Sequence, residues 1–284
     1  MKEEKKKKAN VPNLRFLEFT GEWENITLGE IANIIGGGTP DTTIEEYWNG
    51  NIQWFTPTEI KSDYVAKSNR TITKLGLEKS SAKLLPIGTI LLTTRATIGE
   101  VAIATEKCTT NQGFQSFVVN EHANNIFISN WIKQNKNVFI KKAKGSTFAE
   151  ISKSEIEKIL ILLPTRLEQD KIATFLSLID ERISTQIKIV EGLESLMRSL
   201  REKLFTQKLR FKDSNRNEFP DWALRKLGDL GTFFSGGTPL TLKKDYYNGD
   251  IPFIKSGEIH KNHTEQFISE KALKNSSAKM VEKG

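Results

Sequence analysis

The chain has 284 residues, of which 42 are basic and 35 acidic, so its formal net charge is +7. Its single cysteine, Cys108, excludes a disulfide framework and a thiolate-rich zinc site. No apolar run approaches the roughly 18 residues that a membrane span needs, and the charged tail 1–10 leads into no apolar segment. We therefore expect no contact with a membrane and a cytoplasmic location.

Residues 11–164 predict a first domain of short strands and occasional helices. Turn signals at 36–40 and 49–50 separate apolar segments that are too short for helices. The strand-like segments are 52–55, 89–94, 101–104 and 117–119. Residues 125–143 have the apolar spacing of a helical stretch. This mixture predicts an α+β domain.

Residues 165–209 predict one long helix. Pro164 ends the preceding strand, and Thr165 with Glu168 three residues later has the pattern of a capping box. Apolar side chains then recur in steps of three and four residues, which is typical of a coiled-coil seam. They are Ile172, Leu176, Ile179, Ile183, Ile187, Val190, Leu193, Met197, Leu200 and Leu204. We expect this apolar stripe to assemble with a partner helix; the alternative is a helix that packs on its own domain.

Residues 210–284 repeat the beginning of the first domain. The matching parts are Trp23 with Trp222, 28–31 with 227–230, 37–40 with 236–239, and 80–83 with 276–279. A period of about 200 residues is too long for a solenoid and indicates domain duplication. The second copy stops at Gly284, the counterpart of Gly88. We therefore expect a truncated second domain that exposes apolar faces and strand edges.

Sequence signatures of enzymes are missing from the chain. Gly36–Gly38 lacks the spacing of a phosphate loop, and no G-x-S-x-G or (N/D)-P-P-(Y/F) motif occurs. His260 and His263 lack the further ligands of a metal site. We predict a chain without catalytic residues and without a metal.

Polar and basic loops are the remaining candidates for a site. Arg and Lys side chains reach guanine or phosphate, and Asn and Gln pair with adenine. The candidate DNA-binding residues are Lys61, Tyr64, Asn69, Arg70, Thr94, Arg95, Asn111, Gln112, Lys144 and Thr147. For segment 109–112, a structural turn is an equally good interpretation.

Several motifs, taken in their order along the chain, resemble one known family. The motifs are Gly37-Gly38-Thr39-Pro40, Tyr47-Trp48-Asn49-Gly50, Ser80-Ser81-Ala82-Lys83, Thr109-Thr110-Asn111-Gln112, Gly145-Ser146-Thr147-Phe148 and Glu168-Gln169. With the duplication, the chain resembles the specificity subunit of type I restriction–modification systems. The resemblance implies two target-recognition domains, each reading half of a split sequence in double-stranded DNA, separated by long helices.

The resemblance also implies partners. The long helices would dock modification (methyltransferase) subunits and, through them, the restriction subunit. S-adenosylmethionine, ATP and Mg would belong to those partners, and this chain would hold no cofactor.

Three further interpretations stay open at this point. The chain is the remnant of a fused restriction or methyltransferase enzyme, or it is a coiled-coil interaction protein that binds no DNA. Because the second long helix is missing, two chains would also be able to pair through their single helices as a homodimer.

Overall fold

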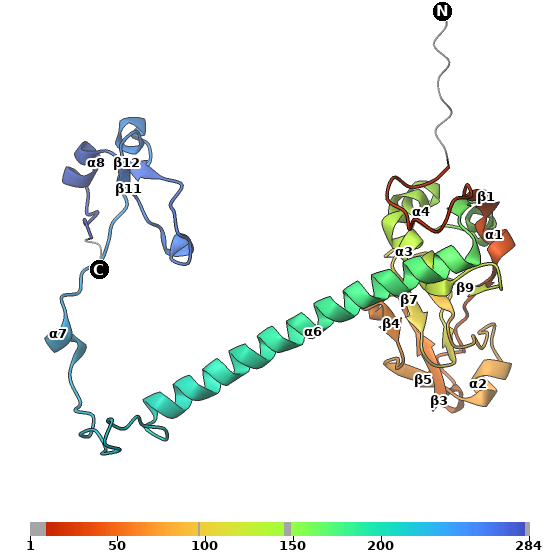
Figure 1. Cartoon of the computed structure of the whole chain (residues 1–284), viewed down its shortest axis with the longest axis horizontal. Helices are drawn as coiled ribbons and strands as arrows, with labels where there is room; N and C mark the ends of the chain where they lie inside the picture. The colour runs from red at the N-terminus through yellow and green to blue at the C-terminus, as the bar shows by residue number, and fades with distance from the viewer. Residues whose placement is uncertain (1–9, 96, 145–148, 282–284) are drawn as a thin grey trace, which may run out of the picture. The chain divides into compact units, whose positions relative to one another are not determined.

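The computed structural model describes residues 10–95, 97–144 and 149–281. It divides into two units, Met1–Ser199 and Leu200–Gly284, which contain the elements labelled in Figure 1. Within the described ranges, no helix is long and apolar enough to cross a membrane.

The first unit is built on a five-stranded sheet. Its order is β2 (Ala32–Gly36), β9 (Phe114–Val119), β6 (Ile90–Thr93), β7 (Val101–Ala104) and β4 (Tyr64–Val65). All neighbours are antiparallel except β4 and β7, which are parallel. Every residue of β6 and β7 is buried, which explains why the sequence shows continuous apolar runs there.

A second, three-stranded sheet carries Trp48 and Trp54. Its order is β5 (Arg70–Ile72), β3 (Trp48–Phe55) and β8 (Cys108–Thr110), with β3 antiparallel to β5 and parallel to β8. Trp48 and Trp54 form a small core with Ile72. The 3-10 turns η1 (Glu45–Tyr47) and η2 (Pro57–Glu59) and helix α2 (Lys74–Glu78) connect these strands.

A short ribbon joins the two ends of the domain. Strand β1 (Glu24–Thr27) pairs antiparallel with β10 (Leu160–Leu163). Helix α1 (Leu28–Ile31) follows β1, and α5 (Lys153–Glu157) precedes β10. The helical stretch predicted over 125–143 is two helices, α3 (Asn125–Gln134) and α4 (Lys136–Lys142), separated at Asn135. The α+β class and the strand-rich character expected from the sequence are confirmed.

Helix α6 (Arg166–Phe205) is 40 residues long, and Figure 1 shows it leaving the sheets after its first turns. Only Glu168, Gln169 and Ala173 are buried along its length. Ile172, Leu176 and Leu204 are half-buried, and the stripe residues between Ile179 and Leu200 are exposed, with Ile183 52% and Met197 60% exposed. One continuous helix therefore presents the predicted stripe; Ile172 at its start packs against the core of the first domain, whereas the stretch from Ile179 to Leu200 is exposed.

The second unit repeats the first part of the first. It contains α7 (Leu227–Leu230), η3 (Lys244–Tyr247), β11 (Ile251–Pro252), η4 (Ser256–Glu258), β12 (Phe267–Ile268) and α8 (Glu270–Lys274). Strands β11 and β12 are antiparallel, and Tyr246, Ile268 and Ala272 form a small core. Phe233, by contrast, is 68% exposed. The apolar exposure expected for this region is present.

Candidate nucleic-acid interface and the root of the long helix

The Arg70 side chain is the most specifically held cation of the candidate set. Its guanidinium carbon lies 3.6 Å from the centroid of the Trp48 ring and 5.7 Å from that of Trp54. The two rings pack edge to face at 5.0 Å, and their indole N–H groups donate to the carbonyls of Asp41 and Gly38. Because both rings are buried and Arg70 is exposed, the stack fixes the planar donor group at the surface.

Residues next to this stack show two different roles. Asn69 is exposed, and its backbone N–H donates to Glu59 Oε1 at 2.6 Å. Gln112 is also exposed, and its Oε1 accepts a hydrogen bond from Thr39 Oγ1 at 2.5 Å. Asn111 instead accepts the backbone N–H of Gly113 through its Oδ1 at 2.9 Å. Asn111 thus has the structural turn role that the sequence left open, whereas Gln112 reaches solvent.

A second basic group combines two loops. Arg95 forms an ion pair with Glu150 at 2.8 Å, and Lys144 lies 3.6 Å from a carboxylate oxygen of Glu155. The Lys144 side chain is 81% exposed, so this pairing leaves its charge available to solvent anions.

The remaining candidate DNA-binding residues lie away from the Arg70 stack, are buried, or fall outside the described residues. Lys61 and Tyr64 are exposed beside β4, an edge strand of the larger sheet. Thr94 is completely buried, and its hydroxyl donates to the carbonyl of Gly113 at 3.1 Å. It supports the fold and offers no group at the surface, contrary to the expectation from sequence. Thr147 lies outside the described residues.

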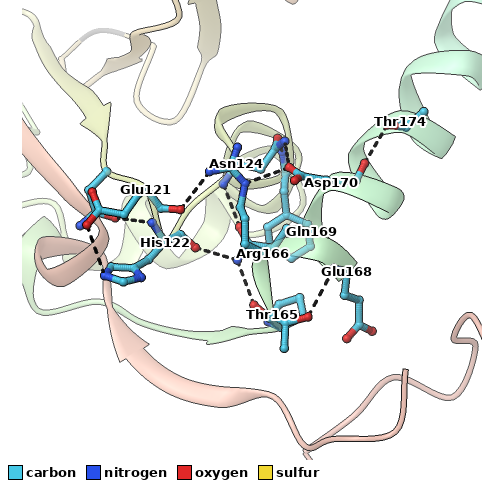
Figure 2. A network of polar contacts seen from close by, with 12 residues as sticks. Glu121, His122, Asn124, Thr165, Arg166, Glu168, Gln169, Asp170 and Thr174 are labelled. Carbon is cyan, nitrogen blue, oxygen red and sulfur yellow. Dashed lines mark hydrogen bonds and ion pairs between the residues drawn. The ribbon is translucent and has the colours of Figure 1, made fainter. Parts of the chain in front are cut away.

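The root of α6 is held by a buried glutamine (Figure 2). Gln169 Nε2 donates to the carbonyls of His122 and Pro164, both at 2.9 Å, and its Oε1 accepts the backbone N–H of Asn124 at 2.8 Å. Since the Gln169 side chain is completely buried, all these bonds are shielded from water.

Asp170 adds a partly exposed layer around that glutamine. Its Oδ1 accepts from Arg166 Nε at 2.9 Å and from Asn124 Nδ2 at 2.7 Å. These hydrogen bonds from Arg166 and Asn124 lower the pKa of the Asp170 carboxyl. Asn124 also caps α3, so the first turn of α6 is fixed to the start of α3.

Glu168 has a role that the sequence reasoning missed. Its backbone N–H donates to Thr165 Oγ1 at 3.4 Å, as a cap requires, but its carboxylate turns away from the cap. Arg15 donates to both of its oxygens, at 2.7 and 2.6 Å, and Trp23 Nε1 donates at 3.2 Å. The repeat in the sequence pointed to these two partners, because Arg15 and Trp23 recur in the second copy as Arg210 and Trp222.

The single cysteine of the chain, Cys108, is buried in β8. Burial raises the pKa of the Cys108 thiol to about 12, so the thiol stays protonated. The described residues contain no group of three or more His, Cys, Asp or Glu side chains that could hold a metal.

The model of the family described as "Type I restriction modification DNA specificity domain" matches residues 20–195. The chain belongs to this family. The match covers the first domain from residue 20 onward and most of α6, and it includes Arg70, Trp48 and Gln169.

Two similar proteins are specificity subunits. It is 33% identical over 279 residues to the type I restriction enzyme MjaIX specificity subunit of Methanocaldococcus jannaschii, covering 91% of this chain and 64% of the relative. It is 30% identical over 197 residues to the EcoR124I/EcoR124II specificity subunit of Escherichia coli, covering 66% of this chain and 48% of the relative. The chain thus spans about half to two thirds of the length of these relatives.

The fold also has a counterpart among solved structures. A chain from a structure on complex assembly and conformational transition of the type I R-M system aligns with a TM-score of 0.50 and 18% identity. The alignment covers 68% of this chain and 46% of that one. This similarity supports the α+β domain followed by a long helix.

Proposed function

We propose that the chain is a non-catalytic DNA-recognition subunit of a type I restriction–modification complex, acting in the cytoplasm. The observation that carries the proposal is the exposed guanidinium of Arg70 stacked on buried Trp48. A fixed planar fork of N–H donors suits bidentate contact with guanine or phosphate of double-stranded DNA. Family membership supplies the class of ligand.

The other exposed candidates fit supporting roles. Lys61, Tyr64, Asn69 and Gln112 provide donors from β4, β5 and the loop after β8, and Arg95 and Lys144 provide positive charge. Lysine contacts of this kind position a protein on the DNA phosphates, whereas guanidinium and amide groups can bind base edges and so distinguish one DNA sequence from another. Thr147 remains a sequence-based candidate.

The DNA test compares Arg70→Ala and Arg70→Lys with Arg198→Ala, an exposed arginine of α6 that serves as the matched control. Binding is measured on duplexes selected from a random pool, at several salt concentrations. We expect Arg70→Ala to weaken binding roughly 5- to 100-fold, as for loss of one bidentate contact. Arg70→Lys would restore a phosphate contact but not a base contact.

Lys144→Ala should weaken binding to all duplexes alike and reduce the salt slope by about one. Salt-independent binding, or equal affinity for Arg70→Ala and Arg198→Ala, would contradict the proposal. A chain that binds modification subunits but no duplex would instead be a coiled-coil interaction protein.

The stripe of α6 supports the second part of the proposal, docking of modification subunits. Ile183 and Leu193 are 52% and 56% exposed, and a carboxylate in an apolar interface costs several kcal/mol unless it is neutralised. Ile183→Asp and Leu193→Asp should therefore abolish co-purification with a modification subunit. Ser195→Asp, on the opposite face of the helix, is the control.

A second copy of this chain is the other proposed occupant of the stripe. Sedimentation of the purified chain distinguishes it, because homodimers would form without modification subunits and would be lost in Ile183→Asp. S-adenosylmethionine, ATP and Mg are assigned by this proposal to the modification and restriction subunits.

A further inference from the structure

The loop that precedes Arg70 recurs in the second unit with the same anchoring hydrogen bond. In the first unit, the backbone N–H of Asn69 donates to Glu59 Oε1 at 2.6 Å, and Glu59 lies in η2. In the second unit, the backbone N–H of Glu265 donates to Glu258 Oε1 at 3.2 Å, and Glu258 lies in η4. One glutamate in each unit therefore ties the loop to the 3-10 turn before it.

A hydroxyl side chain occupies the same place in both loops. Ser68 Oγ donates to the carbonyl of Arg70 at 2.6 Å, and Thr264 Oγ1 donates to the carbonyl of Gln266 at 3.4 Å. In each loop the hydroxyl residue comes directly before the residue that is tied to the glutamate, and the next residue is Arg70 or Gln266. These two bonds make Gln266 the structural counterpart of Arg70.

The pairing of the strands leads to the same equivalence. Arg70 lies directly opposite Trp54 in the antiparallel pair of β3 and β5. The register of β11 with β12, continued by one residue, places Gln266 opposite Phe253, whose backbone N–H donates to the Gln266 carbonyl at 2.9 Å. Directly opposite residues of antiparallel strands have their side chains on the same face of the sheet. Each of the two residues is thus paired with an aromatic residue.

That aromatic residue belongs to a pair of rings in each unit, which we call the aromatic platform. Trp48 and Trp54 pack edge to face with their centroids 5.0 Å apart, and Tyr247 and Phe253 pack edge to face at 6.5 Å. The first ring of each pair donates to a carbonyl of the preceding loop, at 3.0 Å from Trp48 Nε1 and at 2.7 Å from Tyr247 Oη. The second unit therefore keeps the aromatic platform of the first.

The side chain next to the platform differs between the units, from the cation of Arg70 to the neutral amide of Gln266. A phosphate contact depends on positive charge, so an amide would replace an arginine poorly there. The two side chains share instead a planar end that makes two hydrogen bonds at once. Arginine matches the two acceptors of guanine, O6 and N7, and glutamine matches the donor and acceptor of adenine, N6 and N7.

We propose that the residue beside the aromatic platform determines base specificity: Arg70 binds the edge of a guanine, and Gln266 binds the edge of an adenine. This inference rests on the proposed function and assigns a single base to a single side chain within it. Glu59 holds the loop and Trp48 holds the Arg70 side chain, and neither contact depends on the base that is bound. Exchange of one side chain should therefore change the preferred base without changing the fold around it.

The test exchanges the two side chains in the full chain and determines the preferred sequence from a pool of random DNA duplexes. Arg70→Gln should change the preferred base at one position from guanine to adenine and leave the other positions as they are in the wild type. The new preference should be roughly 5- to 100-fold, as for one bidentate base contact. Gln266→Arg should change a different position from adenine to guanine.

Two further variants serve as controls. Arg70→Met separates the loss of the guanidinium from the gain of the amide, because methionine is long and unbranched but has no donor. It should remove the base preference at that position without creating a new one. Lys67→Gln is the matched control for charge, since it takes one positive charge from an exposed side chain of the same loop. It should leave the preferred sequence unchanged.

An Arg70→Gln chain that prefers the wild-type sequence would overturn the proposal. If its salt slope also falls by about one, Arg70 contacts a phosphate and no base edge. A preferred sequence that Gln266→Arg leaves unchanged would overturn the assignment of adenine to the second unit. A wild-type chain that selects no duplex would contradict the proposed function itself, which distinguishes that failure from a failure of this inference alone.

Discussion

The two copies of the half-domain share their turns and caps but differ in what covers them. Thr73 caps α2 and Ser269 caps α8 in the same way, each accepting an N–H three residues later. Ile31 is completely buried, whereas its counterpart Leu230 is 71% exposed. Local sequence therefore forms the local elements in both copies, and burial depends on strands that come later in the chain.

The covering strands of the first unit are β6, β7 and β9. Ile31 and Ile34 share one core with Ile90 and Phe117, which are separated from them by more than fifty residues of sequence. The comparison teaches that the apolar pattern of a half-domain is not sufficient to bury it.

The largest expected difference between the copies is in their apolar residues. Ile31→Ala should lower the free energy of unfolding of the first unit by about 2–5 kcal/mol, because it leaves a cavity. Leu230→Ala should change stability by less than about 0.5 kcal/mol. Urea titration followed by tryptophan fluorescence measures the first effect, and hydrogen exchange measures both. Equal losses would show that Leu230 is buried in solution.

Alanine substitution at the equivalent glycines Gly37 and Gly236 should give a smaller difference in stability between the two copies. Gly37→Ala forces β8 and its neighbours to move, at a cost of about 1–3 kcal/mol. Gly236→Ala should be neutral, or stabilising by less than about 1 kcal/mol through the unfolded chain. Gly36→Ala is the control, because its nearest contact, Gln115 Nε2, would be at an ordinary 3.5 Å. A large loss in Gly236→Ala would mean that other groups contact this glycine in solution.

The smallest expected difference is electrostatic. Hydrogen bonds from Arg166 and Asn124 lower the pKa of Asp170, and one from Lys271 lowers that of Asp245. A carboxyl with a lowered folded-state pKa stabilises above its unfolded value of about 4 and loses that contribution as the pH falls through the folded value. Asp170→Asn should therefore make the free energy of unfolding of the first unit fall less steeply as the pH drops below about 5. Near pH 7 the slope of that free energy against pH should hardly change.

Asp245→Asn should flatten the corresponding profile of the second unit. Thermal unfolding between pH 7 and pH 3, with hydrogen exchange to separate the units, measures both. An unchanged acid profile in Asp170→Asn would indicate that this carboxyl does not hold the root of α6.

Short-range patterns predicted much of this fold. The buried runs of β6 and β7 and the three-to-four spacing of α6 are visible without tertiary information. The break at Asn135 was not predicted, because apolar residues continue on both sides of it.

The candidate site was predicted less completely. The sequence does not distinguish a threonine whose hydroxyl faces solvent from one that, like Thr94, donates to a buried carbonyl. Glu168 had the spacing of a cap, and its true partner, Arg15, is 153 residues away. The stacking of Arg70 on Trp48 likewise depends on the fold of β3 against β5. Sequence identified the residue types and left their partners to tertiary structure.

The closure of the first domain by β1 and β10 has a consequence for the order of folding during synthesis. At about 5–20 residues per second, Arg15 and β1 wait on the order of ten seconds before Glu168 and β10 are made. The N-terminal segment is therefore the last part of the first domain to become ordered, and it fixes the direction of α6 only then. Arg210 meets Asp221 after only 11 residues, so the second copy of this arginine finds a local partner almost as soon as it leaves the ribosome.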